Sequence, residues 1–368
     1  MSWTTEERFL LHAAARGKAL FPSARDIHPR RLLDIALKEG MAGFAYRNFK
    51  EAGFPPHFPE AIQKAFERAY FGSLAGNMRL KKEGLRLLGL FSESGIPVLL
   101  LQGLSLLDLI YEDYGLRPLS DMDFLLPGEF FPKARDVLLK DGFESPPHFP
   151  DVFVKERLQL DLHKDIMNVA RIEGRKDFVY LRFEDLEKYA VRLPEWQGAY
   201  RLRPEANFPL LAAHLVKHSF NRLIWFVDLF RMLMMGEEKF DPAEMMEIAR
   251  GWNLLPSALI PVLFAQERFG LLLPPCLEEG ISQLALRRNF FCRQVLNNRR
   301  AQGMGNFFVA SQMGNLSAKA RFLWEFCFPK REVMAQIYPR WGKNLAISYA
   351  LRFVNLAVKM LRGVLKKP

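Results

Sequence analysis

Arg117-Pro118-Leu119-Ser120-Asp121-Met122-Asp123-Phe124-Leu125-Leu126 is the stretch on which the interpretation of this chain depends. It carries two carboxylates at positions i and i+2, with apolar residues between and after them. On a β-strand, residues i and i+2 project to the same face. We therefore expect Asp121 and Asp123 to point one way, while Met122 and Phe124 enter the core. Paired carboxylates repel each other unless a cation lies between them, and Mg²⁺ takes oxygen ligands, so the pair indicates a metal site.

The residues before this stretch predict a phosphate-binding turn. Residues 96–101 form a short apolar run of strand length that ends at Gln102-Gly103. Residues 104–111 follow with apolar side chains at helical spacing. The order of strand, glycine turn, helix and second strand brings backbone N–H groups and a helix N-terminus near the carboxylates. Such a position favours an anion.

The residues after this stretch supply a third carboxylate. Residues 158–163 alternate between leucine and polar side chains, so Asp161 and His163 share the polar face of a predicted strand. If this strand lies beside the one that carries Asp123, Asp161 joins the same metal site. His163 is then expected to orient Asp161 or to contact substrate, which we favour over direct binding of the metal.

Together these segments resemble a known family. The residues that carry the likeness are Gln102-Gly103, Tyr111, residues 115–118, Asp121 with Asp123, Gly142-Phe143, residues 160–163, His214 with His218, and residues 222–228. They are similar to those of the bacterial family catalogued as "uncharacterised nucleotidyltransferase", within the DNA polymerase β superfamily. The resemblance spans residues 85 to 235. The chain departs from the family at Gln102, where members commonly have lysine, and at Leu104, where the superfamily has a second small residue.

The resemblance implies a reaction and a set of site residues. The reaction is transfer of a nucleoside monophosphate from an NTP to an acceptor hydroxyl, with release of pyrophosphate and with Mg²⁺ or Mn²⁺ as cofactor. The residues assigned to catalysis and metal binding are Asp121, Asp123 and Asp161. The residues assigned to the nucleotide phosphates are Gln102, Gly103, Ser105 and Arg117. The acceptor, whether a small molecule, a saccharide or a protein, is not identified by the sequence.

Two histidines one helical turn apart form a possible second metal site. His214 and His218 have a spacing that can bind zinc, but the segment lacks the glutamate of the protease motif and no third ligand is evident. We interpret them as helix histidines, one of them buried. In the second interpretation one of them faces the nucleotide cleft, where it supports the site without binding the metal.

The overall pattern predicts an α+β protein with a small mixed-sheet, polymerase-β-like core. Helical periodicity dominates before and after the strand-rich region, and Pro204 stands at a suitable first-turn position of a helix. The predicted units are an N-terminal helical segment packed on the core, the nucleotidyltransferase core, and a helical domain with a basic amphipathic C-terminal helix. Their ranges are 1–93, 94–203 and 204–368.

Bulk composition predicts a cytoplasmic protein. The chain has 368 residues, of which 49% are hydrophobic and 25% charged, an ordinary soluble composition. Its three cysteines show no metal-binding spacing, which suits a reducing compartment. The N-terminus carries no recognisable signal peptide, and no uncharged stretch reaches the ~18 apolar residues of a spanning helix. The 32 phenylalanines are not interleaved with basic residues, which makes nucleic acid a less favoured partner.

Positive charge is concentrated at the C-terminus. Residues 281–368 contain 16 Lys and Arg against two acids, whereas the rest of the chain is slightly acidic. Polar residues between Asn344 and Lys366 recur every three or four positions beside a broad apolar face. Residues 344–367 therefore predict either a closing helix of the core or a helix that lies on an anionic membrane. In the latter case the protein is peripheral at the inner face of the membrane.

Two other functions remain open at this point. The first is a catalytically silent relative that acts as a scaffold at a membrane surface, which Gln102, Leu104 and the basic C-terminal quarter favour. The second is a glycosyltransferase that uses its Asp-x-Asp motif to bind a nucleotide-sugar. The short order of strand, glycine turn, helix and strand speaks against the second.

Overall fold

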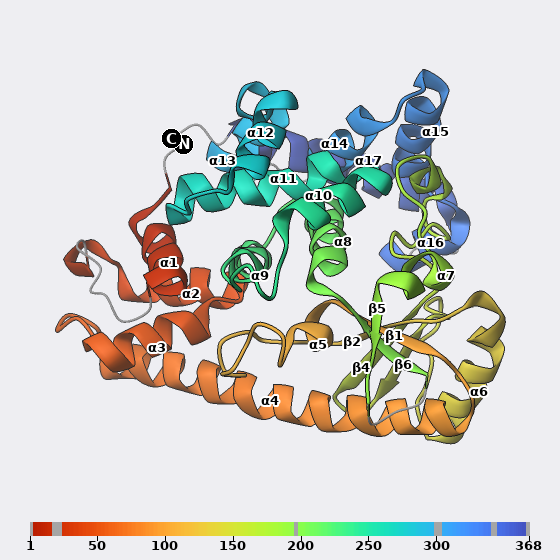
Figure 1. Cartoon of the computed structure of the whole chain (residues 1–368), viewed down its shortest axis with the longest axis horizontal. Coiled ribbons are helices and arrows are strands. Elements are labelled where there is room, and N and C mark those ends of the chain that lie inside the picture. The colour runs from red at the N-terminus through yellow and green to blue at the C-terminus, as the bar shows by residue number, and fades with distance from the viewer. Residues whose placement is uncertain (1–2, 17–23, 195–197, 298–303, 340–343, 366–368) are drawn as a thin grey trace.

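We analysed a computed structural model, which describes residues 3–16, 24–194, 198–297, 304–339 and 344–365. One mixed sheet lies between a long helix below it and a large group of helices above it (Figure 1). Its six strands run in the order β3-β4-β2-β1-β6-β5. Their bounds are β1 Val98–Leu101, β2 Met122–Leu125, β3 Val152–Lys155, β4 Leu158–His163, β5 Ala190–Arg192 and β6 Ala199–Leu202.

The centre of the sheet positions the carboxylates. β2 pairs antiparallel with β1 and parallel with β4. In the parallel pair Asp123 stands directly opposite Asp161, and Leu125 stands opposite His163. The prediction that the two carboxylate-bearing strands are neighbours is confirmed. Because facing residues of paired strands project to the same side, Asp123 and Asp161 share one face.

The opposite face of the sheet is the apolar one that the alternation predicted. Met122, Phe124 and Leu160 are fully buried and belong to one apolar cluster with side chains of α4 (Glu60–Glu93). Phe91 of α4 packs edge-on against Phe124, with ring centroids 6.0 Å apart. The burial of this face leaves the polar face of β2 and β4 to the helices above the sheet.

The N-terminal helices pack on the C-terminal helices as well as on α4. One apolar cluster runs from Trp3 to Phe322, and the backbone N–H of Leu223 donates to Glu39. The bounds of the remaining helices with eight or more residues are α1 Thr5–Arg16, α2 Pro29–Glu39, α3 Ala42–Ala52, α6 Phe131–Lys140, α8 Pro204–Lys217, α9 Leu223–Leu233, α10 Pro242–Gly251, α11 Leu255–Phe264, α12 Pro275–Gln283, α13 Phe290–Asn297, α14 Met304–Gln312, α15 Leu316–Cys327 and α17 Leu345–Leu365.

The helix after the glycine turn differs from the prediction. α5 covers only Gln102–Leu106, whereas the apolar spacing predicted a helix over residues 104–111. It starts on Gln102 itself, whose φ of 50° lies in the left-handed region that costs energy for a residue with a Cβ. Leu107 is extended and forms an isolated bridge to Tyr111, so the chain turns back after one turn and a half of helix.

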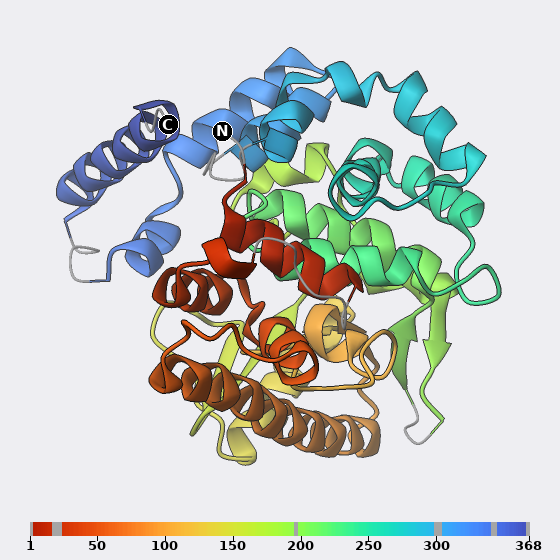
Figure 2. The same cartoon turned by 90° about the vertical axis from the view of Figure 1, so that its left-hand side faces the viewer.

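The last helix, α17, turns two residues of its predicted polar stripe, Ser348 and Arg352, toward the protein, whereas Asn344 and Asn355 of the same stripe are exposed. Ser348 is buried, Arg352 donates to the Cys327 carbonyl at 3.1 Å, and Asn355 donates to the Tyr338 hydroxyl. The exposed apolar side chains of α17 are Ile347, Phe353, Val354 and Val358. The helix lies at the edge of the molecule (Figure 2). The side chains of residues 359–367 lie outside the described residues.

No helix among the described residues is long and apolar enough to cross a membrane.

Candidate active site

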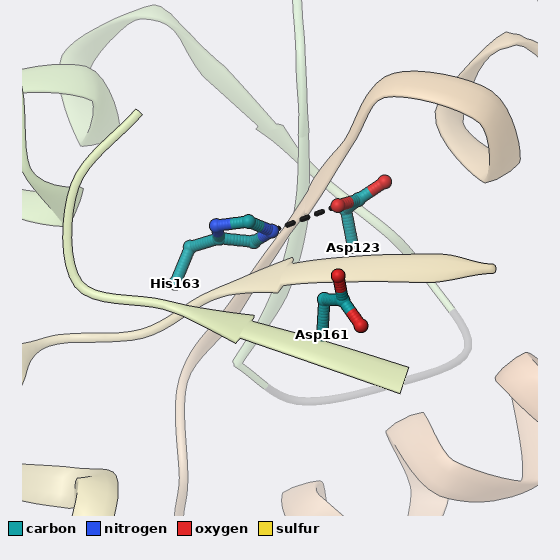
Figure 3. A group of neighbouring side chains, drawn as sticks. All are labelled: Asp123, Asp161 and His163. Atoms are coloured by element: carbon teal, nitrogen blue, oxygen red, sulfur yellow. Dashed lines mark hydrogen bonds and ion pairs between the residues drawn. The ribbon is translucent and has the colours of Figure 1, made fainter. Parts of the chain in front are cut away.

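The polar face of β2 and β4 carries a compact group of possible metal ligands. One ligand atom each from Asp123, Asp161 and His163 lies within 4.8 Å of the other two, and all three side chains project from the same face (Figure 3). His163 Nε2 lies 2.7 Å from Asp123 Oδ1, and Asp161 accepts a hydrogen bond from Gln159 at 2.9 Å. His163 therefore orients Asp123, whereas the sequence pointed to Asp161 as the carboxylate it would orient.

Asp121 stands at the edge of this group. It lines the same cavity as Asp123 and Asp161, and the Ser120 hydroxyl donates to it at 3.1 Å. Burial and the charges of Asp123 and Asp161 raise the pKa of Asp121 to about 6. The three carboxylates thus interact electrostatically, as neighbouring anions do in the absence of a cation.

This repulsion leads to a prediction for Asp121→Asn in the protein stripped of metal with EDTA. The folded-state pKa is raised above the ordinary value of about 3.9. Ionisation of Asp121 therefore does not destabilise the fold below pH 4. The destabilisation grows as the pH rises and reaches its full size above pH 6. At pH 7.5 the free energy of unfolding of the variant, measured with urea, should exceed that of wild type by about 1–2 kcal/mol. Near pH 4 the two proteins should unfold at the same urea concentration. An equal difference at both pH values would contradict the raised pKa of Asp121, which burial and the two neighbouring carboxylates cause.

The carboxylates form one wall of a cavity of about 500 Å³. Gln102 and Gly103 line it from the turn after β1. Its basic lining residues come from several segments, namely Arg117, Arg171, Arg175, Lys217, Arg222 and Arg352. A cavity lined by both carboxylates and cations matches a substrate that carries both a metal ion and phosphate groups.

The cations of this cavity were missed by the sequence analysis. Lys217 interacts electrostatically with Asp123, and burial together with Arg175 lowers the pKa of Lys217 to about 8. Burial and the charge of Arg171 lower the pKa of Arg175 to about 10. Lys217 stands between the two histidines in His-Leu-Val-Lys-His. Its position next to His218 was a sequence signal that could have identified it as a residue of the cavity. Arg171 lies in a turn and Arg175 in the short 3-10 helix Glu173–Asp177, and neither element is long enough for a periodic pattern to mark a face.

Ser105 lies apart from the other residues predicted to bind phosphate. Its hydroxyl donates to the Gln102 carbonyl at 2.7 Å. It lines a separate cavity of about 360 Å³, with Lys81, Asp108 and Arg201. Ser105 therefore contacts the backbone of the glycine turn but does not line the cavity that Gln102 and Gly103 border.

Arg117 is held in a buried ion pair. Its Nε and Nη2 donate to the carboxylate of Asp228 in α9 at 2.9–3.0 Å, and the Tyr111 hydroxyl donates to the same carboxylate at 2.6 Å. Arg117 still borders the cavity. Two of the Arg117 nitrogens are hydrogen-bonded to Asp228. Arg117 therefore connects the loop that carries Asp121 to α9.

His214 and His218 both line the cavity beside Trp225. The two imidazole centroids lie 4.4 Å apart. His214 meets the Trp225 ring edge-on at 5.1 Å between centroids, and His218 lies tilted to it at 5.4 Å. Removal from water, with the charge of Lys217, lowers the pKa of His218 to about 3. Burial and His218 hold the pKa of His214 well below its ordinary value. Both rings are therefore neutral at physiological pH and face the same space as Asp123.

Comparison with known proteins shows the family. Residues 25–270 match the family model described as uncharacterised nucleotidyltransferase. The match covers well over half of the chain, so the protein belongs to this family, as the resemblance implied. It includes the sheet and all of the cavity lining discussed above except Arg352. No curated protein and no solved structure matches the chain.

Proposed function

We propose that this protein is a metal-dependent nucleotidyltransferase that moves a nucleoside monophosphate from an NTP to an acceptor hydroxyl. One observation carries the proposal. Asp123 and Asp161 face each other in register at the wall of a cavity that also carries basic side chains. The glycine turn of Gln102 and Gly103 borders the same space. Family membership supports nucleotidyl transfer, and the donor set supports the metal requirement.

The residues present fit a divalent cation. Carboxylate oxygens are preferred ligands of Mg²⁺ and Mn²⁺, and an imidazole beside them is also suited to Mn²⁺. Asp121, Asp123 and Asp161 would hold the ions, with His163 fixing the orientation of Asp123. When bound, two such ions supply activation of the attacking oxygen and neutralisation of the leaving pyrophosphate.

The chain's own residues account for the remaining steps. The acceptor oxygen forms a bond to the α-phosphorus as the bond to the α–β bridging oxygen breaks, and pyrophosphate leaves. Asp161 accepts the proton of the acceptor hydroxyl, since burial raises the pKa of this carboxyl above its ordinary value. The backbone at Gly103 and the side chain of Gln102 hold the phosphates without a lysine at that position.

A thermal-shift experiment tests this function. The melting temperature should rise when an NTP and Mg²⁺ or Mn²⁺ are added together, and much less with either alone, because the carboxylates and the triphosphate share the ion. Nucleotide-sugars should give the smaller shift. A larger shift with a nucleotide-sugar would favour the glycosyltransferase, and no shift with any nucleotide would favour the silent scaffold.

The orientation of α17 favours a second role at a membrane surface. The outer side of this helix presents Phe353 and Val354, of which Val354 is 59% exposed, and the Phe328 ring lies 5.1 Å from Phe353. Trp324 packs against Phe328 at 4.2 Å and is itself largely exposed. A continuous row of aromatic and aliphatic side chains in the most basic quarter of the chain is what an anionic bilayer interface binds.

Liposome flotation tests the membrane role. We expect wild type to float with anionic liposomes at low salt, and the double variant Phe353→Ser with Val354→Ser to stay in the bottom fraction. The matched control is Leu316→Ser, which removes an apolar side chain that is 82% exposed but lies outside α17. If the double variant floats as well as the control, the apolar side of α17 is not the membrane contact.

A further inference from the structure

We propose that a second cavity, on the α4 side of the sheet, binds a small organic anion with an apolar body and acts as an effector site on the glycine turn. It is the cavity of about 360 Å³ that Ser105 lines, which is within the size range of natural ligand sites. The binding of the anion is independent of the proposed function, and only the effector role rests on it.

The register of the central strands separates this cavity from the one that the carboxylates line. Leu100 of β1 stands opposite Phe124 of β2 and Arg201 of β6. Asp123 stands opposite Leu101, the next residue of β1. Facing residues of paired strands project to the same side, and successive residues to opposite sides. Leu100 and Arg201, which line the second cavity, therefore lie on the face of the sheet opposite to Asp123.

The second cavity combines an apolar floor with a few charged groups. Its leucines belong to the apolar cluster between the sheet and α4 or pack against it, and they are Leu85, Leu100, Leu104, Leu107 and Leu193. The charged lining residues are Lys81, Asp108 and Arg201. A largely apolar lining with a few placed polar groups binds a ligand that has an apolar body and a polar end.

Arg201 is the charged residue of this cavity that lacks a partner. Lys81 Nζ lies 2.8 and 2.6 Å from the two carboxylate oxygens of Asp108 and 2.6 Å from the Tyr114 hydroxyl, which also donates to Asp108. Among the residues that the structure describes, none forms a hydrogen bond or an ion pair with the Arg201 guanidinium, and Asp108 interacts with it only electrostatically. A partly buried cation without a contacting anion is costly, and a carboxylate or phosphate group would offset that cost through charge-assisted hydrogen bonds.

The short helix α5 connects this cavity to the glycine turn. Gln102 and Gly103, at the start of α5, line the cavity of the carboxylates, whereas Leu104 and Ser105 line the second one. The Ser105 hydroxyl donates to the Gln102 carbonyl at 2.7 Å. A ligand that contacts Leu104 and Ser105 therefore acts on the turn that we propose to hold the phosphates. By linkage, this ligand and the nucleotide change each other's affinity.

Isothermal titration calorimetry with hexanoate and, separately, hexyl phosphate tests the binding site. We expect one or both of these six-carbon anions to bind wild type, with an affinity that Arg201→Gln lowers at least tenfold, because hydrogen bonds to charged groups are the strong ones. Acetate and inorganic phosphate carry the charge without the chain, and hexan-1-ol carries the chain without the charge. None of the three should show binding that depends on Arg201. The six-carbon anion that binds more tightly identifies the head group as a carboxylate or a phosphate.

Arg192→Gln is the matched control, because Arg192 is exposed on the neighbouring strand β5 and lines neither cavity. It should leave every affinity unchanged, and circular dichroism verifies that both variants are folded. The binding site is refuted if neither six-carbon anion binds, or if Arg201→Gln binds them as tightly as wild type does.

The effector role is tested by titrating a non-hydrolysable α,β-methylene NTP with Mg²⁺ in the presence of the tighter probe. The nucleotide affinity of wild type should change about fivefold or more, the usual lower end of coupling between sites. That of Arg201→Gln should not change. An unchanged affinity in wild type overturns the effector role. A protein that binds the probe but no nucleotide refutes the nucleotidyltransferase function, and the effector role falls with it, whereas the binding site stands.

Discussion

Asp123→Asn is expected to abolish metal-dependent nucleotidyl transfer, lowering kcat by about 10³-fold or more. The substitution removes one negative charge from the centre of the ligand group and changes almost no volume. Loss of metal-based charge stabilisation is worth several kcal/mol in a transition state, which corresponds to this factor. The amide oxygen can still accept a hydrogen bond at the position where Asp123 meets His163. The fold should therefore be retained.

Pyrophosphate release from an NTP in the presence of Mg²⁺, with a mixture of hydroxyl-bearing acceptors, measures this effect. Asp136→Asn is the matched control, because Asp136 is exposed on α6 and lies outside the cavity. The control should keep wild-type turnover, and both variants should keep the wild-type circular dichroism spectrum. Full activity in Asp123→Asn would place the chemistry elsewhere in the molecule.

Asp228→Ala is expected to destabilise the fold by about 3–5 kcal/mol, the usual cost of removing one partner from a buried ion pair. Asp228 is 2% exposed and accepts hydrogen bonds from the buried Arg117 and Tyr111. Its removal leaves a guanidinium without a counter-charge and a phenol without an acceptor, both in the apolar interior. Urea unfolding measures the loss.

An exposed pair provides the control for this prediction. Asp34 pairs with Arg30 on α2, with side chains that are 59% and 70% exposed, so Asp34→Ala should cost at most about 1 kcal/mol. The double variant Arg117→Met with Asp228→Leu should recover much of the stability, because it removes both charges together. If Asp228→Ala unfolds at the same urea concentration as Asp34→Ala, the pair does not hold the loop to α9.

The Arg117 pair also changes the interpretation of Arg117 and of residues 222–228, which include Asp228. In the sequence, Arg117 and Asp228 looked like parts of separate features, a phosphate clamp and a helix. The structure joins them, and Lys217, Arg171 and Arg175 line the same cavity as Arg117.

The local sequence pattern determined which face of each strand is polar. Alternation in residues 122–125 and 158–163 places Met122 and Leu160 in the core and Asp123 and Asp161 opposite them, and the structure confirms it. This was predictable because side-chain alternation is a property of the extended backbone alone. The helical character of α4 and α8 also followed from local periodicity. The family was identified from the resemblance that its short motifs carry.

Only the tertiary structure decided what surrounds those carboxylates. The partner of Arg117 lies 111 residues further along the chain, and the cations of the cavity come from the segment after β4, from the end of α8, from the start of α9 and from α17. The tertiary structure also decided that Ser348 and Arg352 of α17 face the protein, whereas Phe353 and Val354 are exposed. Periodicity defines the two sides of a helix or strand. Which side is covered depends on packing between segments that are distant in sequence. No local pattern encodes which segments pack together.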